Sequence, residues 1–112
     1  MNIAGPTQEE RNGALITYIL TGLLSWLGGL IGWLIWKDKG AYAKSQTTEA
    51  LNFGITTLIG FVIIHIVASV IHGLYFLHSI LWLVQLIFGI VAALAASKGE
   101  NYRFPFALRL VK

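Results

Sequence analysis

The fold is decided by residues 51–97, which read LNFGITTLIGFVIIHIVASVIHGLYFLHSILWLVQLIFGIVAALAAS and contain no Lys, Arg, Asp or Glu. A transmembrane helix needs about 20 apolar residues, each rising ~1.5 Å, to cross ~30 Å of hydrocarbon. The stretch is too long for one crossing and suits two crossings joined by a tight turn. We therefore expect spans near 52–71 and 79–97, with the turn between them over 72–78.

A further uncharged run lies nearer the N-terminus, over residues 14–36, and ends at the charged sequence Lys37-Asp38-Lys39-Gly40. This run is also long enough to cross a bilayer once. The sequence thus predicts an all-α integral membrane protein, a three-helix transmembrane bundle that forms a single membrane domain over residues 1–112. A short interfacial helix over 41–50 and an interfacial C-terminal tail are expected to complete it.

Composition agrees with a membrane protein. The chain is 56% hydrophobic and 12% charged, whereas soluble domains carry about 25% charged residues. The absence of cysteine excludes disulfides and thiolate metal sites. The net charge of +3 comes from basic residues that flank apolar runs, so the expected partner is the lipid bilayer and not nucleic acid.

Orientation follows from the positive-inside rule, which keeps basic residues on the cytoplasmic side. Three crossings place Arg11 alone on one side and seven basic residues on the other. These seven, expected to act as topology signals or to contact lipid headgroups, are Lys37, Lys39, Lys44, Lys98, Arg103, Arg109 and Lys112. The prediction is a multi-pass protein with its N-terminus outside and its C-terminus in the cytoplasm. Pairing of Glu10 or Arg11 with the cluster of Glu49, Glu100 and Arg103, expected on the opposite side, would contradict it.

Each expected span carries small or polar residues about four positions apart, which places them on one helical face. Such faces allow close helix packing in lipid. The residues expected in helix packing or partner contact are Thr21, Ser25, Gly28, Gly32, Asn52, Thr56, Gly60, Gln85, Gly89 and Ala93. An alternative interpretation is that Thr17, Thr21, Asn52, Thr56, His65 and Gln85 line a pathway.

Groups suited to chemistry are few. His65 falls in the middle of the second expected span and is a candidate intramembrane polar site, because polar residues at that depth are costly. The five acidic residues all lie outside the expected spans. No catalytic arrangement or metal-ligand set is apparent, so we expect no catalysis, no metal and no cofactor. Thr7 and Glu10 have capping-box spacing, which indicates a helix starting near Gln8.

Four stretches carry a family resemblance: ERNGAL at 10–15, WLIWKD at 33–38, EALNF at 49–53 and KGENYRFP at 98–105. Together they resemble small bacterial membrane proteins of unknown function that are related to the twenty-kilodalton subunit of the chloroplast inner-envelope protein import translocon. The resemblance implies a helical protein of the bacterial cytoplasmic (inner) membrane. For the plastid branch it implies protein translocation.

The expected function is that of a small polytopic membrane protein. It acts by helix–helix contact as an accessory or assembly subunit of a larger membrane complex, with other membrane subunits or further copies of itself as partners. One alternative is a component of a protein-translocation or channel assembly, as the resemblance implies. A second alternative is a cofactor-bearing membrane subunit that uses His65 or His72.

Overall fold

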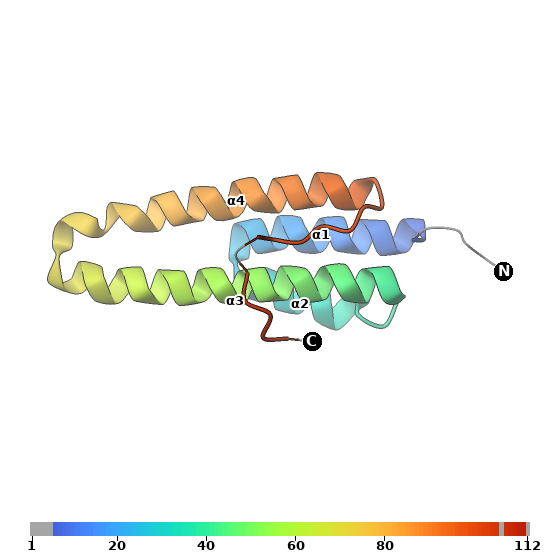
Figure 1. Ribbon diagram of the computed structural model, residues 1–112, viewed down its shortest axis with the longest axis horizontal. Coiled ribbons are helices and arrows are strands. Elements are labelled where there is room, and N and C mark those ends of the chain that lie inside the picture. The colour runs from blue at the N-terminus through green and yellow to red at the C-terminus, as the bar shows by residue number, and fades with distance from the viewer. Residues whose placement is uncertain (1–5, 106, 112) are drawn as a thin grey trace.

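The computed structural model describes residues 6–105 and 107–111, and within them the chain is helical with no strand (Figure 1). The elements are α1 (Gln8–Leu24), α2 (Trp26–Trp36), α3 (Ala41–Val70), the 3₁₀ turn η1 (His72–Leu74) and α4 (Phe76–Ser97). The molecule is elongated, with extents of 59 × 22 × 20 Å. The all-helical part of the prediction is confirmed.

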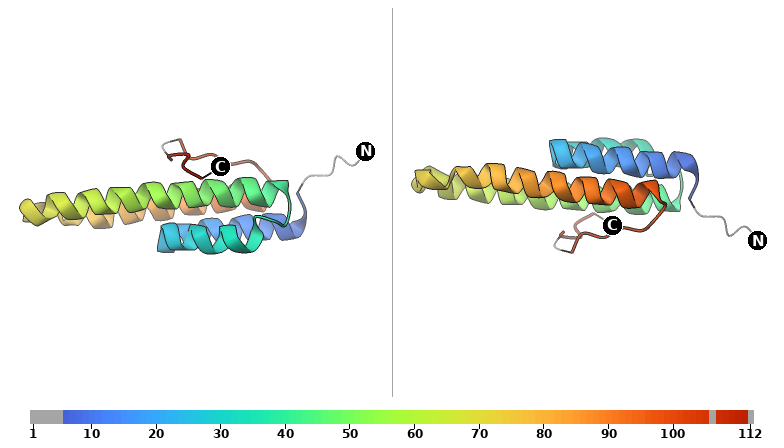
Figure 2. Two further views of the ribbon diagram at one scale, coloured as in Figure 1. Left: turned by 90° about the horizontal axis from the view of Figure 1, so that it is seen from below. Right: turned by 90° about the horizontal axis from the view of Figure 1, so that it is seen from above.

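Two antiparallel hairpins form two layers, and the tail forms a third (Figure 2). The long hairpin consists of α3 and α4, and the short hairpin of α1 and α2 packs on one of its faces. Helix α1 contacts α2, α3 and α4, whereas α2 lies against α1 and α3. The tail after α4 runs back over the opposite face of the long hairpin.

Helix α1 begins as expected. Thr7 is its N-cap, and its hydroxyl accepts the Glu10 backbone N–H at 3.1 Å. The Glu10 carboxylate in turn accepts the Thr7 N–H at 3.1 Å. This reciprocal pair is the predicted capping box, and it satisfies two backbone donors that the first helical turn would otherwise leave free.

The expected single span over 14–36 is wrong, because the helix breaks at Ser25. This residue has φ 60° and ψ −133°, a positive φ that non-glycine residues rarely adopt. Its hydroxyl lies 2.7 Å from the Thr57 hydroxyl and donates to the Gly54 carbonyl at 3.0 Å. These bonds to α3 hold the reversal, and α2 runs back along α1.

Glycines make the close approach between α1 and α2 possible. A Cβ at Gly28 would overlap the Leu20 carbonyl, and one at Gly32 would overlap the Thr17 side chain. The Gly28/Gly32 pair therefore packs inside the short hairpin. The sequence spacing predicts that these glycines share one helical face, but it gives no indication that the chain reverses three residues before the first of them.

Helix α3 is a continuous helix of 30 residues, so the expected separate interfacial helix over 41–50 is its first part. Residues 41–53 contain neither Gly nor Pro, the residues that most strongly interrupt a helix. Helix α4 starts at Phe76 rather than at 79, since the turn at η1 is shorter than expected. Of the described helices, α3 and η1–α4 are long and apolar enough to cross a membrane.

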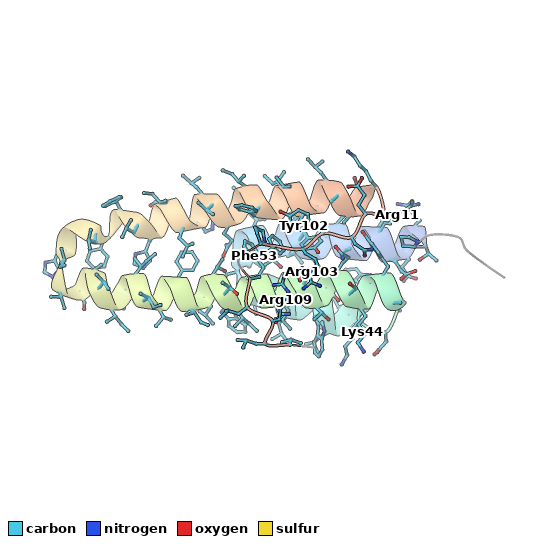
Figure 3. All side chains as sticks on the ribbon, in the orientation of Figure 1. Arg11, Lys44, Phe53, Tyr102, Arg103 and Arg109 are labelled. Carbon is cyan, nitrogen blue, oxygen red and sulfur yellow. The ribbon has the colours of Figure 1, made fainter. Side chains whose placement is uncertain are left out.

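The N-terminal segment lies beside the first loop, which contradicts the expected separation of the two. The Glu10 carboxylate accepts the backbone N–H groups of Tyr42 and Ala43 at 3.1 and 3.2 Å. Glu9 and Lys39 approach to 4.0 Å. Because the short hairpin returns to the end where it began, the described charged residues gather in one half of the molecule, with Arg103 and Arg109 near its middle (Figure 3).

Candidate functional site

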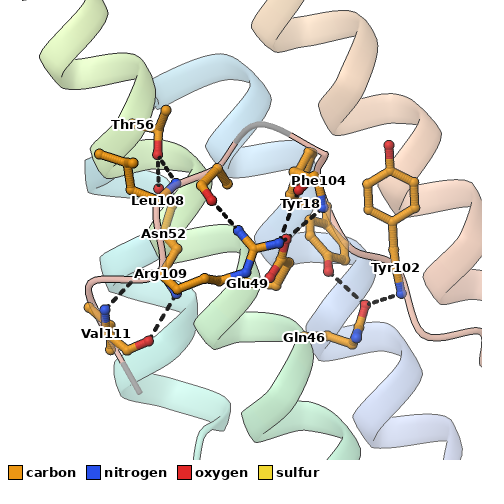
Figure 4. A network of polar contacts seen from close by, with 11 residues as sticks. Tyr18, Gln46, Glu49, Asn52, Thr56, Tyr102, Phe104, Leu108, Arg109 and Val111 are labelled. Atoms are coloured by element: carbon orange, nitrogen blue, oxygen red, sulfur yellow. Dashed lines mark hydrogen bonds and ion pairs between the residues drawn. The ribbon is translucent and has the colours of Figure 1, made fainter.

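The tail runs along the first half of α3, and side chains of α3 bind its backbone (Figure 4). Gln46 accepts the Tyr102 N–H at 3.0 Å, and Thr56 accepts the Leu108 N–H at 2.8 Å. Asn52 bonds Val111 twice, accepting its N–H at 2.7 Å and donating to its carbonyl at 2.9 Å. An extended segment has no ladder of backbone–backbone hydrogen bonds, so these side chains supply partners that its backbone requires.

An ion pair reinforces this attachment. Arg109 lies 3.1 Å from the carboxylate of Glu49, which is buried. The same carboxylate accepts the Phe104 N–H at 2.6 Å. Arg109 also donates to the carbonyls of Phe104 and Ala107. Glu49 is therefore both paired and hydrogen-bonded, as a buried carboxylate must be.

Aromatic rings fix the tail to the core of the bundle. Phe104 is 1% exposed and meets Tyr18 of α1 edge-on, with ring centroids 5.7 Å apart. The Tyr18 hydroxyl donates to Gln46 at 2.6 Å. Burial, and then the nearby Glu49 carboxylate, raise the pKa of Tyr102. The Tyr102 ring therefore stays neutral at physiological pH.

A cavity of ≈ 530 Å³ lies between α3 and the tail. Its polar and charged lining residues include Lys44, Ser45, Thr48, Glu49, Asn52, Tyr102, Arg103 and Arg109. Lys44 comes from α3, whereas Arg103 and Arg109 come from the tail (Figure 3). Three cations thus surround one carboxylate that Arg109 already neutralises, which leaves the cavity positively charged.

The predicted contact residues divide among three places. Asn52 and Thr56 hold the tail, and Gly60 lies against Leu81 of α4. The remaining members of the set lie where the short hairpin packs on α3 and α4 or on itself: Thr21, Ser25, Gly28, Gly32, Gln85, Gly89 and Ala93. The structure does not bring Thr17, Thr21, Asn52, Thr56, His65 and Gln85 together along one pathway, because Thr17 and Thr21 bond backbone carbonyls within α1 and His65 is exposed.

Gln85 and Trp82 of α4 donate hydrogen bonds to backbone carbonyls at the C-terminal end of α1. Gln85 donates to the Gly22 carbonyl at 3.0 Å, and the Trp82 indole donates to the Leu23 carbonyl at 3.3 Å. Both carbonyls lose their helical partners where α1 stops. At Gly22 the α1 backbone also touches α4 closely, because a Cβ on Gly89 would lie 2.8 Å from the Gly22 Cα.

Three residues that make these contacts, Gln46, Glu49 and Trp82, were absent from the predicted contact set. Gln46 and Glu49 precede Asn52 and Thr56 on the same face of α3, with spacings of three or four that continue the stripe toward the N-terminus. This stripe of polar residues is the sequence pattern that could have identified Gln46 and Glu49. Trp82 carried no signal, since nothing in the sequence indicates that α1 ends beside it.

The histidines lie at the end of the molecule far from the charges. His65 is exposed, and its ring centroid is 6.3 Å from that of His78. His72 is at the turn and stacks near Tyr75 at 6.2 Å. Within the described ranges no group of three or more His, Cys, Asp or Glu could hold a metal ion. A cofactor on His65 or His72 stays a prediction.

The described basic residues that were expected on one side lie in the same half of the molecule, and Arg11 lies there too (Figure 3). A Cβ on Gly99, next to Lys98, would lie 3.2 Å from the Arg11 side chain. Lys37 stacks over the Trp33 ring at 4.2 Å. The last member of the predicted set, Lys112, lies outside the described residues.

The sequence model of the magnetosome magnetite crystal formation protein family, MamF/MmsF, matches residues 9–111. The chain belongs to this family. The match covers nearly all of both hairpins and the tail that closes on α3, so it includes the contacts between α3 and the tail. No curated protein and no solved structure matches the chain significantly.

The match overturns the resemblance to the chloroplast translocon subunit. The stretches EALNF and KGENYRFP, which carried that resemblance, hold the buried contact between α3 and the tail. These residues stabilise the fold, and a shared fold does not imply a shared function. The translocation function that was expected from them has no support.

Proposed function

We propose that this chain is an accessory protein of the magnetosome membrane, which takes part in magnetite crystal formation through contacts with other membrane proteins and without catalysis of its own. The family match over residues 9–111 carries the proposal. The placement of charged and apolar surface supports the membrane part of it.

The apolar surface is the first support. Large apolar side chains point outward along both candidate spans: Val62, Ile63, Ile66 and Val70 on α3, and Leu83, Ile87 and Leu94 on α4, are 45% exposed or more. The core helix of a soluble protein would bury such residues. Outward apolar faces of this extent suit contact with lipid or with another membrane helix.

Under this proposal α3 and α4 cross the bilayer, and the short hairpin enters and returns on the same side. The 22 residues of α4 span about 33 Å, enough for the hydrocarbon core. An interrupted helix at membrane depth needs partners for its freed backbone groups. The bonds from Gln85, Trp82 and Ser25 supply such partners.

The positive-inside rule then gives an orientation different from the one expected from the sequence. All seven described basic residues lie in the half of the molecule that holds the N-terminal segment and the first loop (Figure 3). Both termini are therefore proposed to face the cytoplasm, with only the η1 turn on the other side.

Labelling of single cysteines tests this placement, since the natural chain has none. Gln8→Cys, Asp38→Cys and Gly73→Cys lie at exposed positions. In sealed membrane vesicles, a thiol reagent that cannot cross the bilayer is expected to label positions 8 and 38 from the same side and position 73 from the other. Labelling of positions 8 and 73 from one side would restore the three-span arrangement.

Deletion of the gene tests the role itself. We expect magnetite crystals of altered size or number by electron microscopy, restored by the natural chain. Purification in mild detergent is expected to retain other magnetosome membrane proteins in fixed proportion. Unchanged crystals together with a chain that purifies alone would contradict an accessory role.

A further inference from the structure

We propose that the cavity between α3 and the tail binds a phosphate ester group, supplied by an anionic phospholipid of the membrane in which the protein lies. The inference rests on the bilayer placement proposed above. It assigns a ligand to a cavity whose free charges do not take part in the packing of the chain.

The unpaired charge in the cavity is the first observation. Glu49 is neutralised by Arg109 at 3.1 Å and already accepts the Phe104 N–H. Across the described residues, the side chains of Lys44 and Arg103 form no ion pair and no hydrogen bond, although both line the cavity. A group with one or two negative charges would complement these two cations.

Hydroxyl groups are the second observation. Ser45 and Thr48 lie one turn apart on α3 and both line the cavity. The Thr48 oxygen accepts the Trp33 indole N–H at 3.1 Å, so its own proton is free to donate to a further acceptor. Two cations with two hydroxyl donors make a set suited to the several acceptor oxygens of a phosphate.

The position of the cavity favours a lipid as the source of that phosphate. The cavity lies beside the point where the uncharged stretch of α3 begins at Leu51. Asn52, Ile59 and Ile63 follow one another on one face of α3, and Ile59 and Ile63 are 39% and 55% exposed. A headgroup seated between Lys44 and Arg103 can therefore extend its acyl chains along this apolar face. A cavity of ≈ 530 Å³ is large enough for a headgroup and its glycerol.

Matched charge variants test the site. Lys44→Gln combined with Arg103→Gln removes the two free cations of the cavity. Lys39→Gln combined with Lys98→Gln removes the same net charge at exposed positions outside the cavity. Circular dichroism in uncharged detergent checks that both double variants fold.

Phosphatidylglycerol, phosphatidylcholine and inorganic phosphate are then added separately to the purified chain, and binding is measured by native mass spectrometry and by the shift in thermal midpoint. We expect phosphatidylglycerol to bind, with affinity at least about tenfold weaker in the cavity variant and little changed in the control. Phosphatidylcholine is expected to bind weakly because its choline adds a positive charge.

The arms distinguish the sources of the phosphate. Binding of inorganic phosphate that is lost in the cavity variant would support the site and assign it a soluble ligand. Equal losses in the two double variants, or phosphatidylglycerol binding that neither variant changes, would overturn the site. Cysteine labelling tests the bilayer placement separately, so the failure of either proposal is recognisable on its own.

Discussion

The ring of Phe104 lies flat on the ring of Phe53, with centroids 3.9 Å apart and planes 3° from parallel. Phe53 is in the middle of α3, and Phe104 is seven residues beyond the end of α4. The tail is therefore part of the hydrophobic core and not an appendage at the surface.

Truncation of Phe104 should release the tail. Phe104→Ala removes the stack and leaves a cavity among buried rings, which typically costs about 3–5 kcal/mol of unfolding free energy. The loss can be measured by titration with sodium dodecyl sulfate in uncharged micelles, and tail release by faster proteolysis after Arg103. Phe76→Ala, at a 56% exposed position, is the control. Equal stability of the two variants would show that the tail does not belong to the core.

The sequence predicted the helices well because helix formation in an apolar run depends on local composition and length. The capping box at Thr7, the two long apolar helices and the turn near Gly73 all follow from patterns within about twenty residues. The charge-free stretch over 51–97 was sufficient to place the long hairpin.

The break at Ser25 and the attachment of the tail depend on contacts between residues that are distant in the sequence. Nothing near Ser25 marks a break, because the reversal is held by Gly54 and Thr57 some thirty residues away. Asn52 and Thr56 were recognised as a polar stripe, but their partners Val111 and Leu108 offer only backbone groups. A backbone group leaves no trace in a sequence pattern, so the tail positions that Asn52 and Thr56 bind could not be predicted.

Glu10 should make stability depend on pH. Its bond from the Thr7 backbone lowers its pKa most, bonds from Ala43 and Tyr42 lower it further, and burial opposes them, so the pKa lies below its ordinary value of 4.5. A carboxyl with a lowered pKa adds stability that is fully present above about 4.5 and is lost as the pH falls through the folded-state pKa. Glu10→Gln should cost about 1–2 kcal/mol at pH 7, with the difference from the natural chain vanishing at low pH.

Unfolding titrations from pH 7 to pH 3 provide the measurement for Glu10. Glu9→Gln is the matched control, because the Glu9 side chain is 65% exposed. A difference between the natural chain and Glu10→Gln that stays constant over this range would mean that the carboxylate charge is unimportant.

Ser25 should carry two separable effects, its hydroxyl bonds and its positive φ. Ser25→Ala loses the bonds to Gly54 and Thr57 and keeps the strained backbone, whereas Ser25→Gly loses the same bonds and relieves the strain. The glycine variant should therefore be more stable than the alanine variant by about 1–2 kcal/mol. Chemical unfolding of both in the same micelles gives the comparison. A more stable alanine variant would mean that α1 and α2 do not reverse at this residue.

Gly28 should tolerate no side chain, because the short hairpin closes on it. A Cβ there would overlap the Leu20 carbonyl carbon and oxygen, and these backbone atoms cannot turn aside as the end of a flexible side chain can. Gly28→Ala should then cost about 1–3 kcal/mol, although alanine favours helices over glycine by nearly 1 kcal/mol. Gly73→Ala meets nothing within 4 Å and should be close to neutral. If α1 and α2 instead formed one straight span, position 28 would face no such carbonyl, and Gly28→Ala would stabilise the chain through helix propensity. The sign of the change in unfolding free energy therefore distinguishes the hairpin from the span.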